Sequence, residues 1–205
     1  WPILVLVVVT IPAMVLEGAS MDWSAIYMRD SFGSDKFWQG IAVASFAVLQ
    51  GLMRFYADGV VERFSPAALA RVLFVALGLG CITVVLSPWP ILSLIGFAAM
   101  GLGTSAIFPL AMSAAAQRND RPSALNIAAL AQFSFMIFLI APPILGFIAH
   151  GWGIRTAYGI ALPFADPAPE CARRGGGADR IAGAAERLAE HRADGAVIIG
   201  DQDGL

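Results

Sequence analysis

Glu17 is the first candidate for a functional side chain, because it is a carboxylate within a long apolar stretch. An ionised carboxylate inside a bilayer costs a few kcal/mol, about 3 kcal/mol on insertion scales, unless it faces a partner or water. Ser20 and Ser24 follow at spacings of three and seven, so a helix places them on the same face. The stripe predicts a group that binds a proton or a solute beside a cavity. A protonated or hydrogen-bonded glutamate that ties two helices together is the alternative.

Further polar side chains lie inside apolar runs and are candidates for binding a solute. Gln50 and Gln132 are amides within such runs, although an interhelical hydrogen bond would explain each equally well. Pro109 cannot donate to the carbonyl of Ser105, so we expect a bend there. Irregular backbone at membrane depth is tolerated chiefly where it lines a cavity. Thr104 and Ser105 would then offer polar groups to a solute, unless the kink serves packing alone.

Other residues suit structural or gating roles. Arg54 stands four residues before Asp58, and we expect the two to pair and brace a cytoplasmic loop. Pro142, followed by a second proline, frees a carbonyl one turn earlier and would let that end of its helix flex. Asp22 is expected to end the first helix at the membrane interface.

Neither the cysteines nor the histidines form a recognisable site. Cys81 and Cys171 lack CxxC spacing and nearby histidines, so both are expected to be free thiols. His150 and His191 are far apart, and neither HExxH nor GxSxG occurs. No basic cluster is interleaved with aromatic residues. We therefore expect no metal, no cofactor, no nucleic-acid partner and no enzymatic activity.

The elements that position these residues are predicted to be transmembrane helices. Of the 205 residues, 58% are hydrophobic and 14% charged, and the mean hydropathy is +0.73, which suits a bilayer. About 20 apolar residues span a membrane, and five runs are long enough. These are residues 1–28, 37–55, 67–86, 89–116 and 124–149. Their connections are short, so the fold class is an all-α, polytopic transmembrane bundle of antiparallel helices.

Basic residues in alternate loops indicate the orientation. One side carries Arg54, Arg63, Arg71, Arg118 and Arg121, and the other carries Arg29, Lys36 and Arg155. The bias predicts a cytoplasmic amino terminus. An aromatic belt is expected at the outer interface, formed by Trp23, Tyr27, Phe37, Trp38, Trp89 and Trp152.

Both ends of the chain look unusual. The sequence starts at Trp1 in an apolar run, so we expect an upstream part. A sixth helix starts near Arg155 but meets Pro163, and residues 163–205 are a polar, low-complexity tail that we expect to be disordered. The domains are thus a bundle over residues 1–162 and this tail. The tail is either genuine or the product of a reading-frame change, because a shifted frame permits an apolar helix there.

Several motifs resemble those of the major facilitator superfamily, in particular bacterial sugar permeases and drug-efflux proteins. They are the stretch from Glu17 to Ser24, Gly101-Leu102-Gly103 with Pro109, and Ala141 to Gly146. In the family, a Gly-x-x-x-Asp-Arg-x-Gly loop locks neighbouring helices. Here it reads Asp58 to Ser65, with Glu62 in place of the aspartate, Arg63 retained, and neither glycine present.

The resemblance implies half of a twelve-helix fold, with five full helices and a truncated sixth. It also implies secondary active transport of a small solute by alternating access, with Glu17 as a possible site of proton coupling. The expected partners are the lipid bilayer, the solute and the missing amino-terminal half, without which the chain should be inactive. The expected location is a bacterial inner membrane. A non-transporting membrane receptor or scaffold and an inert truncated product are the alternatives.

Overall fold

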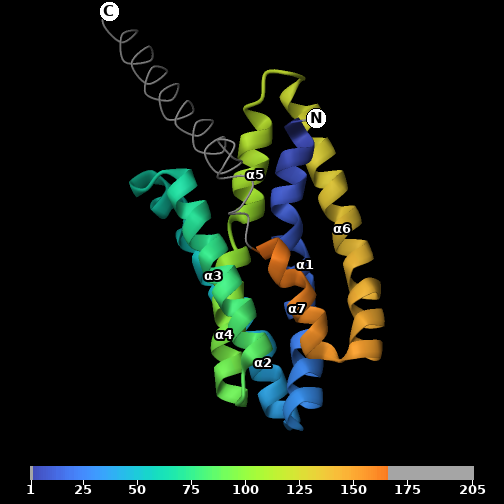
Figure 1. The fold of residues 1–205 in the computed structure, drawn as a ribbon. Helices are drawn as coiled ribbons and strands as arrows, with labels where there is room; N and C mark the ends of the chain where they lie inside the picture. Colours follow the sequence, from blue (N-terminus) through green and yellow to red (C-terminus); the bar gives the residue numbers. More distant parts are fainter. Residues whose placement is uncertain (1, 166–205) are drawn as a thin grey trace, which may run out of the picture.

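The computed structural model describes residues 2–165, and these are almost entirely helical (Figure 1). The helices are α1 (Pro2–Phe32), α2 (Lys36–Arg63), α3 (Pro66–Leu86), α4 (Pro90–Thr104), α5 (Ile107–Ala116), α6 (Ser123–Trp152) and α7 (Ile154–Ala165). No strand occurs among the described residues, so the predicted all-α fold class is confirmed. Residues 166–205 of the predicted tail, including Cys171, lie outside them.

Five stretches of the described chain are long and apolar enough to span a membrane. They coincide with the five predicted runs, and α4 and α5 together make one of them. Successive spans run in opposite directions (Figure 1). The amino terminus lies at the same end as the α5–α6 loop, whereas the α6–α7 turn lies at the other end.

The first two helices are longer than we predicted. α1 continues past Asp22 and Met28 to Phe32, where Gly33 adopts a positive φ of 63° and ends it. Asp22 therefore does not end the helix, contrary to our expectation. α2 continues past Phe55 to Arg63, so most of the predicted loop is helical.

The end of α2 is set by the sequence that follows it. Nothing before Pro66 prevents helix formation, and a proline disfavours helical geometry at the residue before it. Ser65 then begins α3, since its side-chain oxygen accepts a hydrogen bond from the amide of Ala68 at 3.3 Å.

Prolines affect the later helices differently. The fourth span is interrupted at Ser105 and Ala106, one turn before Pro109, as a proline that removes an amide donor predicts. In contrast, α6 is continuous through Pro142 and Pro143. α7 extends past Pro163 to Ala165 and ends about half-way along α6 (Figure 1).

α1 is the central helix, because it packs against α2, α4, α5, α6 and α7. Around its second half the rings of Tyr27, Phe97 and Tyr158 meet edge to face at 5.5–5.8 Å between centroids. Tyr27 is fully buried, and its hydroxyl donates to the carbonyl of Val84. We predicted Tyr27 in an interfacial aromatic belt, but its ring is buried within the bundle and does not form part of the outer surface.

α4 is held tightly between α2 and α3 by glycines. A Cβ at Gly101 would clash with the carbonyl oxygen of Phe46 in α2. On the α3 side, Gly96 faces Gly80, and a Cβ on Gly103 would meet the backbone of Leu77 at 2.6 Å. Small residues let helix backbones approach closely in membranes, so these contacts fix the position of α4.

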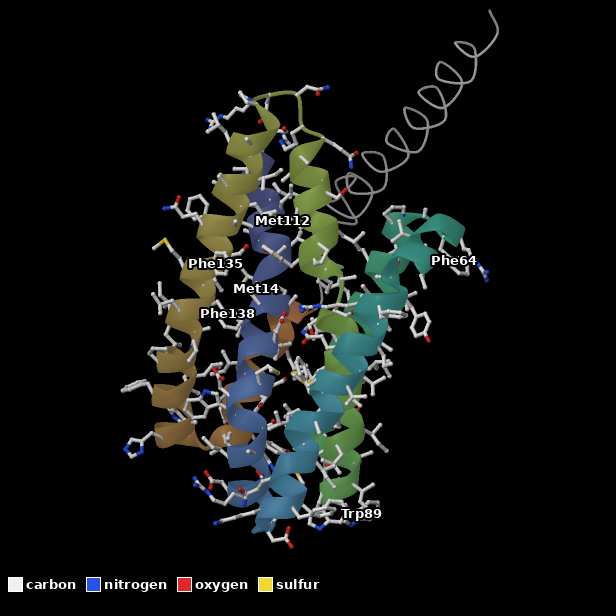
Figure 2. The ribbon with its side chains drawn as sticks, turned by 180° about the vertical axis from the view of Figure 1, so that it is seen from behind. Met14, Phe64, Trp89, Met112, Phe135 and Phe138 are labelled. Carbon is white, nitrogen blue, oxygen red and sulfur yellow. The ribbon has the colours of Figure 1, made fainter. Side chains whose placement is uncertain are left out.

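The outer surface is apolar, as a bilayer requires. Large hydrophobic side chains are exposed on α2, α3, α4 and α6. Phe135 points outward from α6, Phe64 is exposed beside the turn between α2 and α3, and Trp89 is exposed near the other end of α3 (Figure 2). α2 and α6 are the least buried spans, so each presents a broad face outside this bundle.

Gly101→Ala should destabilise the bundle by about 1–3 kcal/mol, because the added methyl overpacks a backbone contact. Gly51→Ala is the matched control: a Cβ at Gly51, on exposed α2, would have no neighbouring atom within 4 Å, and alanine favours helix by up to about 1 kcal/mol. Thermal unfolding of the purified protein in detergent checks both. Equal unfolding temperatures for the two variants would contradict the tight contact.

Candidate functional site

Glu17 forms an ion pair with Arg54 inside the membrane-spanning bundle. An Nη2 atom of Arg54 lies 3.1 Å from Oε1 of Glu17 and donates to it. The carboxylate side chain is 14% exposed, and the arginine side chain is 47% exposed. A charged group in a membrane is tolerated when it meets an opposite charge, so the pair accounts for both residues at this depth.

The carbonyl of Ser105 is a second acceptor for Arg54, whose Nε atom donates to it at 3.0 Å. Pro109 stands four residues after Ser105 and has no amide proton to offer this carbonyl. The break between α4 and α5 therefore supplies an acceptor that an unbroken helix would have used internally. The helix is interrupted before Pro109, where we expected a bend, and Arg54 of α2 donates to the carbonyl that the interruption leaves free.

Arg54 lies within α2, which corrects our expectation of a loop there, while its expected pairing with Asp58 stays a prediction. Because α2 runs to Arg63, Arg54 lies about 13 Å, at 1.5 Å per residue, before the helix end. Its side chain thus reaches across the bundle toward Glu17 rather than along its own helix. The side chain of Asp58 is not among those described.

Gln50 and Thr104 extend the same site by one turn. Nε2 of Gln50 donates to Oγ1 of Thr104 at 3.2 Å, and both residues are buried. Thr104 in turn donates to the carbonyl of Gly101, and the Ser105 hydroxyl donates to that of Leu102. Glu17, Gln50, Arg54, Thr104 and Ser105 together form what we call the polar cluster.

Several buried oxygens of α1 have no hydrogen-bond partner among the described residues. Oε2 of Glu17 and the hydroxyl oxygens of Ser20 and Ser24 are buried, and they accept or donate no hydrogen bond among the described residues. The three residues form the predicted stripe on α1, which faces the bundle interior. Unsatisfied buried oxygens have unused capacity to bind a proton, water or a solute hydroxyl.

The other predicted residues lie outside the polar cluster. Gln132 is exposed on α6, and Pro142 lies within that continuous helix. Asp58, Glu62 and Arg63 are in the last turns of α2; Arg63 is exposed, and the side chain of Glu62 is not described.

Cys81 is buried as a free thiol, and no metal-binding group of His, Cys, Asp and Glu occurs within the described part of the chain.

Arg54 is the member whose contact the sequence analysis missed. The sequence predicts a connection after this residue because the apolar run ends at Phe55. The available signal was its spacing of four from Gln50, which puts both on one face of a helix that continues. The second signal is that the apolar run containing Glu17 has no basic residue to pair with its carboxylate, so a partner has to come from another helix.

Comparison with known proteins gives a family for this architecture. Residues 5–165 match the model of the Major Facilitator Superfamily. The chain is 32% identical over 149 residues to an uncharacterized transporter, y4wD, of Sinorhizobium fredii, covering 73% of this chain and 40% of that protein. It is also 26% identical over 147 residues to an uncharacterized MFS-type transporter of Yersinia pestis, covering 71% of this chain and 38% of the relative.

A third relative is the membrane protein MosC of Rhizobium meliloti, 28% identical over 150 residues. The match covers 70% of this chain and 35% of MosC. The chain thus spans well under half the length of these relatives. No solved structure matches it significantly.

The energetic coupling between Glu17 and Arg54 tests the site directly. A double-mutant cycle with Glu17→Gln and Arg54→Gln should give a coupling of about 1–3 kcal/mol, because either single change leaves a charge without its partner. The pair of Arg29 and Asp30, with side chains 60% and 46% exposed, is the matched control. Its cycle should give about 0–1 kcal/mol, as exposed pairs do. Unfolding in detergent measures both cycles, and equal couplings would refute a special role for the inner pair.

Proposed function

This chain belongs to the major facilitator superfamily, and from that premise we propose that the protein moves a small solute across a membrane by secondary active transport. The proposal concerns transport rather than catalysis, in keeping with the two relatives that are named transporters. The observation that carries it is the polar cluster, in which an ion pair joins α1 and α2 beside the broken α4–α5 span.

Glu17 is proposed as the proton-sensing group. Protonation removes its negative charge and with it the ionic attraction for Arg54, while the hydrogen bond from Arg54 to the carbonyl of Ser105 is unaffected by that charge. Hydrogen bonds from Arg54 to Glu17 and Ser105, and from Gln50 to Thr104, link α2 to α1 and to the α4–α5 span. The loss of one of them therefore weakens the attachment between these helices. A solute hydroxyl or carbonyl can accept from the same donors, and a solute hydroxyl can donate to the unpaired oxygen of Glu17.

Alternating access is proposed to occur around the polar cluster. The break at Ser105 and Ala106 joins two rigid helical segments, a geometry in which short elements absorb a change of backbone angle. Rocking requires a second bundle, and the relatives are more than twice the matched length. We propose that an amino-terminal half supplies the other wall, and that this chain alone is inactive.

The proposed membrane is a bacterial inner membrane, with the amino terminus in the cytoplasm. Arg63, Arg71, Arg118 and Arg121 lie toward the end of the bundle that carries the amino terminus, and Arg29, Lys36 and Arg155 lie toward the other. Arg54 is left out of this comparison of basic residues at the two ends, since it lies within α2 in the polar cluster. A bias of four to three supports this orientation.

Uptake into proteoliposomes by the complete protein tests the proton-sensing role. With the double change Glu17→Gln and Arg54→Gln, both charges are removed together, so the bundle keeps no unpaired charge and should fold. We expect acceleration of uptake by a pH gradient to fall at least about tenfold, a loss typical of removing a proton-transfer group.

Asp35→Asn serves as the control, because it removes a carboxylate outside the polar cluster. Asp35 caps α2 by accepting from the amide of Trp38, and asparagine caps equally well. Uptake by this variant should match the unaltered protein. If the double variant still responds fully to the pH gradient, Glu17 is not the proton-coupling residue. If neither variant nor the unaltered protein moves solute, transport itself is refuted.

A further inference from the structure

A second polar site lies at the end of the bundle where α1 ends and α6 meets α7. It is a hollow of about 680 Å³ lined by residues of all three helices. Its charged and ionisable lining consists of Arg29, Asp30, His150 and Arg155. The polar cluster contributes none of its residues to this hollow, so the hollow is a separate feature.

The charges of the hollow favour an anion. Asp30 is the one acidic side chain of the lining, and it is paired with Arg29 at 2.7 Å. Arg155 forms no ion pair with any residue that the structure describes, and neither does His150. The lining therefore has an arginine without an anionic partner, a histidine able to gain a positive charge and a second arginine at the rim.

Arg155 is held in place by aromatic rings. Its guanidinium carbon lies 5.2 Å from the centre of the Phe32 ring and 5.9 Å from that of Tyr27. Such stacking orients the planar guanidinium and leaves its edges free to donate hydrogen bonds. The cation is thus positioned before a ligand arrives, which lowers the entropy cost of binding.

Two tryptophans locate the hollow at the membrane surface. Trp23 packs on α6 where a Cβ at Gly146 would come within 2.9 Å of its ring, and Trp152 is largely exposed at the end of that helix. Tryptophan is enriched at the interface between hydrocarbon and water. The most abundant anionic groups at that depth are the phosphates of lipid head groups, and dissolved phosphate esters reach it from the water.

We propose that this hollow binds a phosphate-bearing anion, with Arg155 as its principal ligand and Arg29 and His150 in support. A guanidinium matches the oxygens of a phosphate in a bidentate manner, and its charge strengthens both hydrogen bonds. The volume suits a head group or a small phosphate ester, as binding pockets of about 300–1,000 Å³ do.

Calorimetric titration of the purified protein in a neutral detergent tests the proposal with three probes. Short-chain phosphatidylglycerol carries the phosphate and acyl chains, glycerol phosphate carries the phosphate alone, and short-chain diacylglycerol carries the chains alone. At least one phosphate probe should bind at least about tenfold more tightly than diacylglycerol. Binding of phosphatidylglycerol alone identifies a lipid head group as the source, and equal binding of glycerol phosphate identifies a dissolved ester.

The variants separate a specific site from general charge attraction. Arg155→Gln should weaken the binding of the phosphate probe by about tenfold or more, since it removes the bidentate ligand. Arg121→Gln removes the same charge at the opposite end of the bundle, where Arg121 is exposed, and should leave affinity unchanged. If Arg155→Gln fails to fold, Arg29→Gln combined with His150→Gln tests the same hollow from exposed positions. Equal affinities for diacylglycerol and the phosphates, or equal effects of the Arg155 and Arg121 changes, overturn the proposal.

Discussion

The structure depends on how charge is accommodated inside a membrane-spanning bundle. Glu17 is costly at its depth unless something compensates for it, and Arg54 does so from a neighbouring helix. Arg54 is itself satisfied only because Pro109 leaves the carbonyl of Ser105 free. A carboxylate, an arginine and a proline from three separate spans thus form one arrangement. Each of the three is unfavourable in its own helix and becomes acceptable through the other two.

Close packing brings these groups together. Gly101 lets α4 approach the backbone of Phe46, one turn from the hydrogen bond that joins Gln50 to Thr104. The glycines on the opposite side of α4 hold it against α3, so the broken span is fixed from both sides. The distance at which Arg54 meets Ser105 is therefore set by glycine positions that carry no polar chemistry. In this bundle the close contacts of small residues therefore position the polar site.

Much of this could be predicted from the sequence, and the failures have physical causes. Hydropathy predicted the five spans correctly because the bilayer imposes a length and a composition on each one. Glu17 and the break before Pro109 were predictable because each violates a local rule. The partner of Glu17 was not, because a charged stretch after Phe55 resembles a loop although nothing in it stops a helix. The burial of Tyr27 was not predictable, because the carbonyl that accepts from its hydroxyl comes from Val84, which is distant in the sequence.

The central claim is that Glu17 is an ionised carboxylate held by Arg54 within the span. Infrared difference spectroscopy of the protein in lipid bilayers, with isotope-labelled glutamate and Glu17→Gln for assignment, measures its protonation state directly. The account predicts carboxylate bands from Glu17 at neutral pH and their replacement by a protonated carbonyl band in Arg54→Gln. A protonated carbonyl band in the unaltered protein would contradict the ion pair and favour a neutral glutamate that joins two helices.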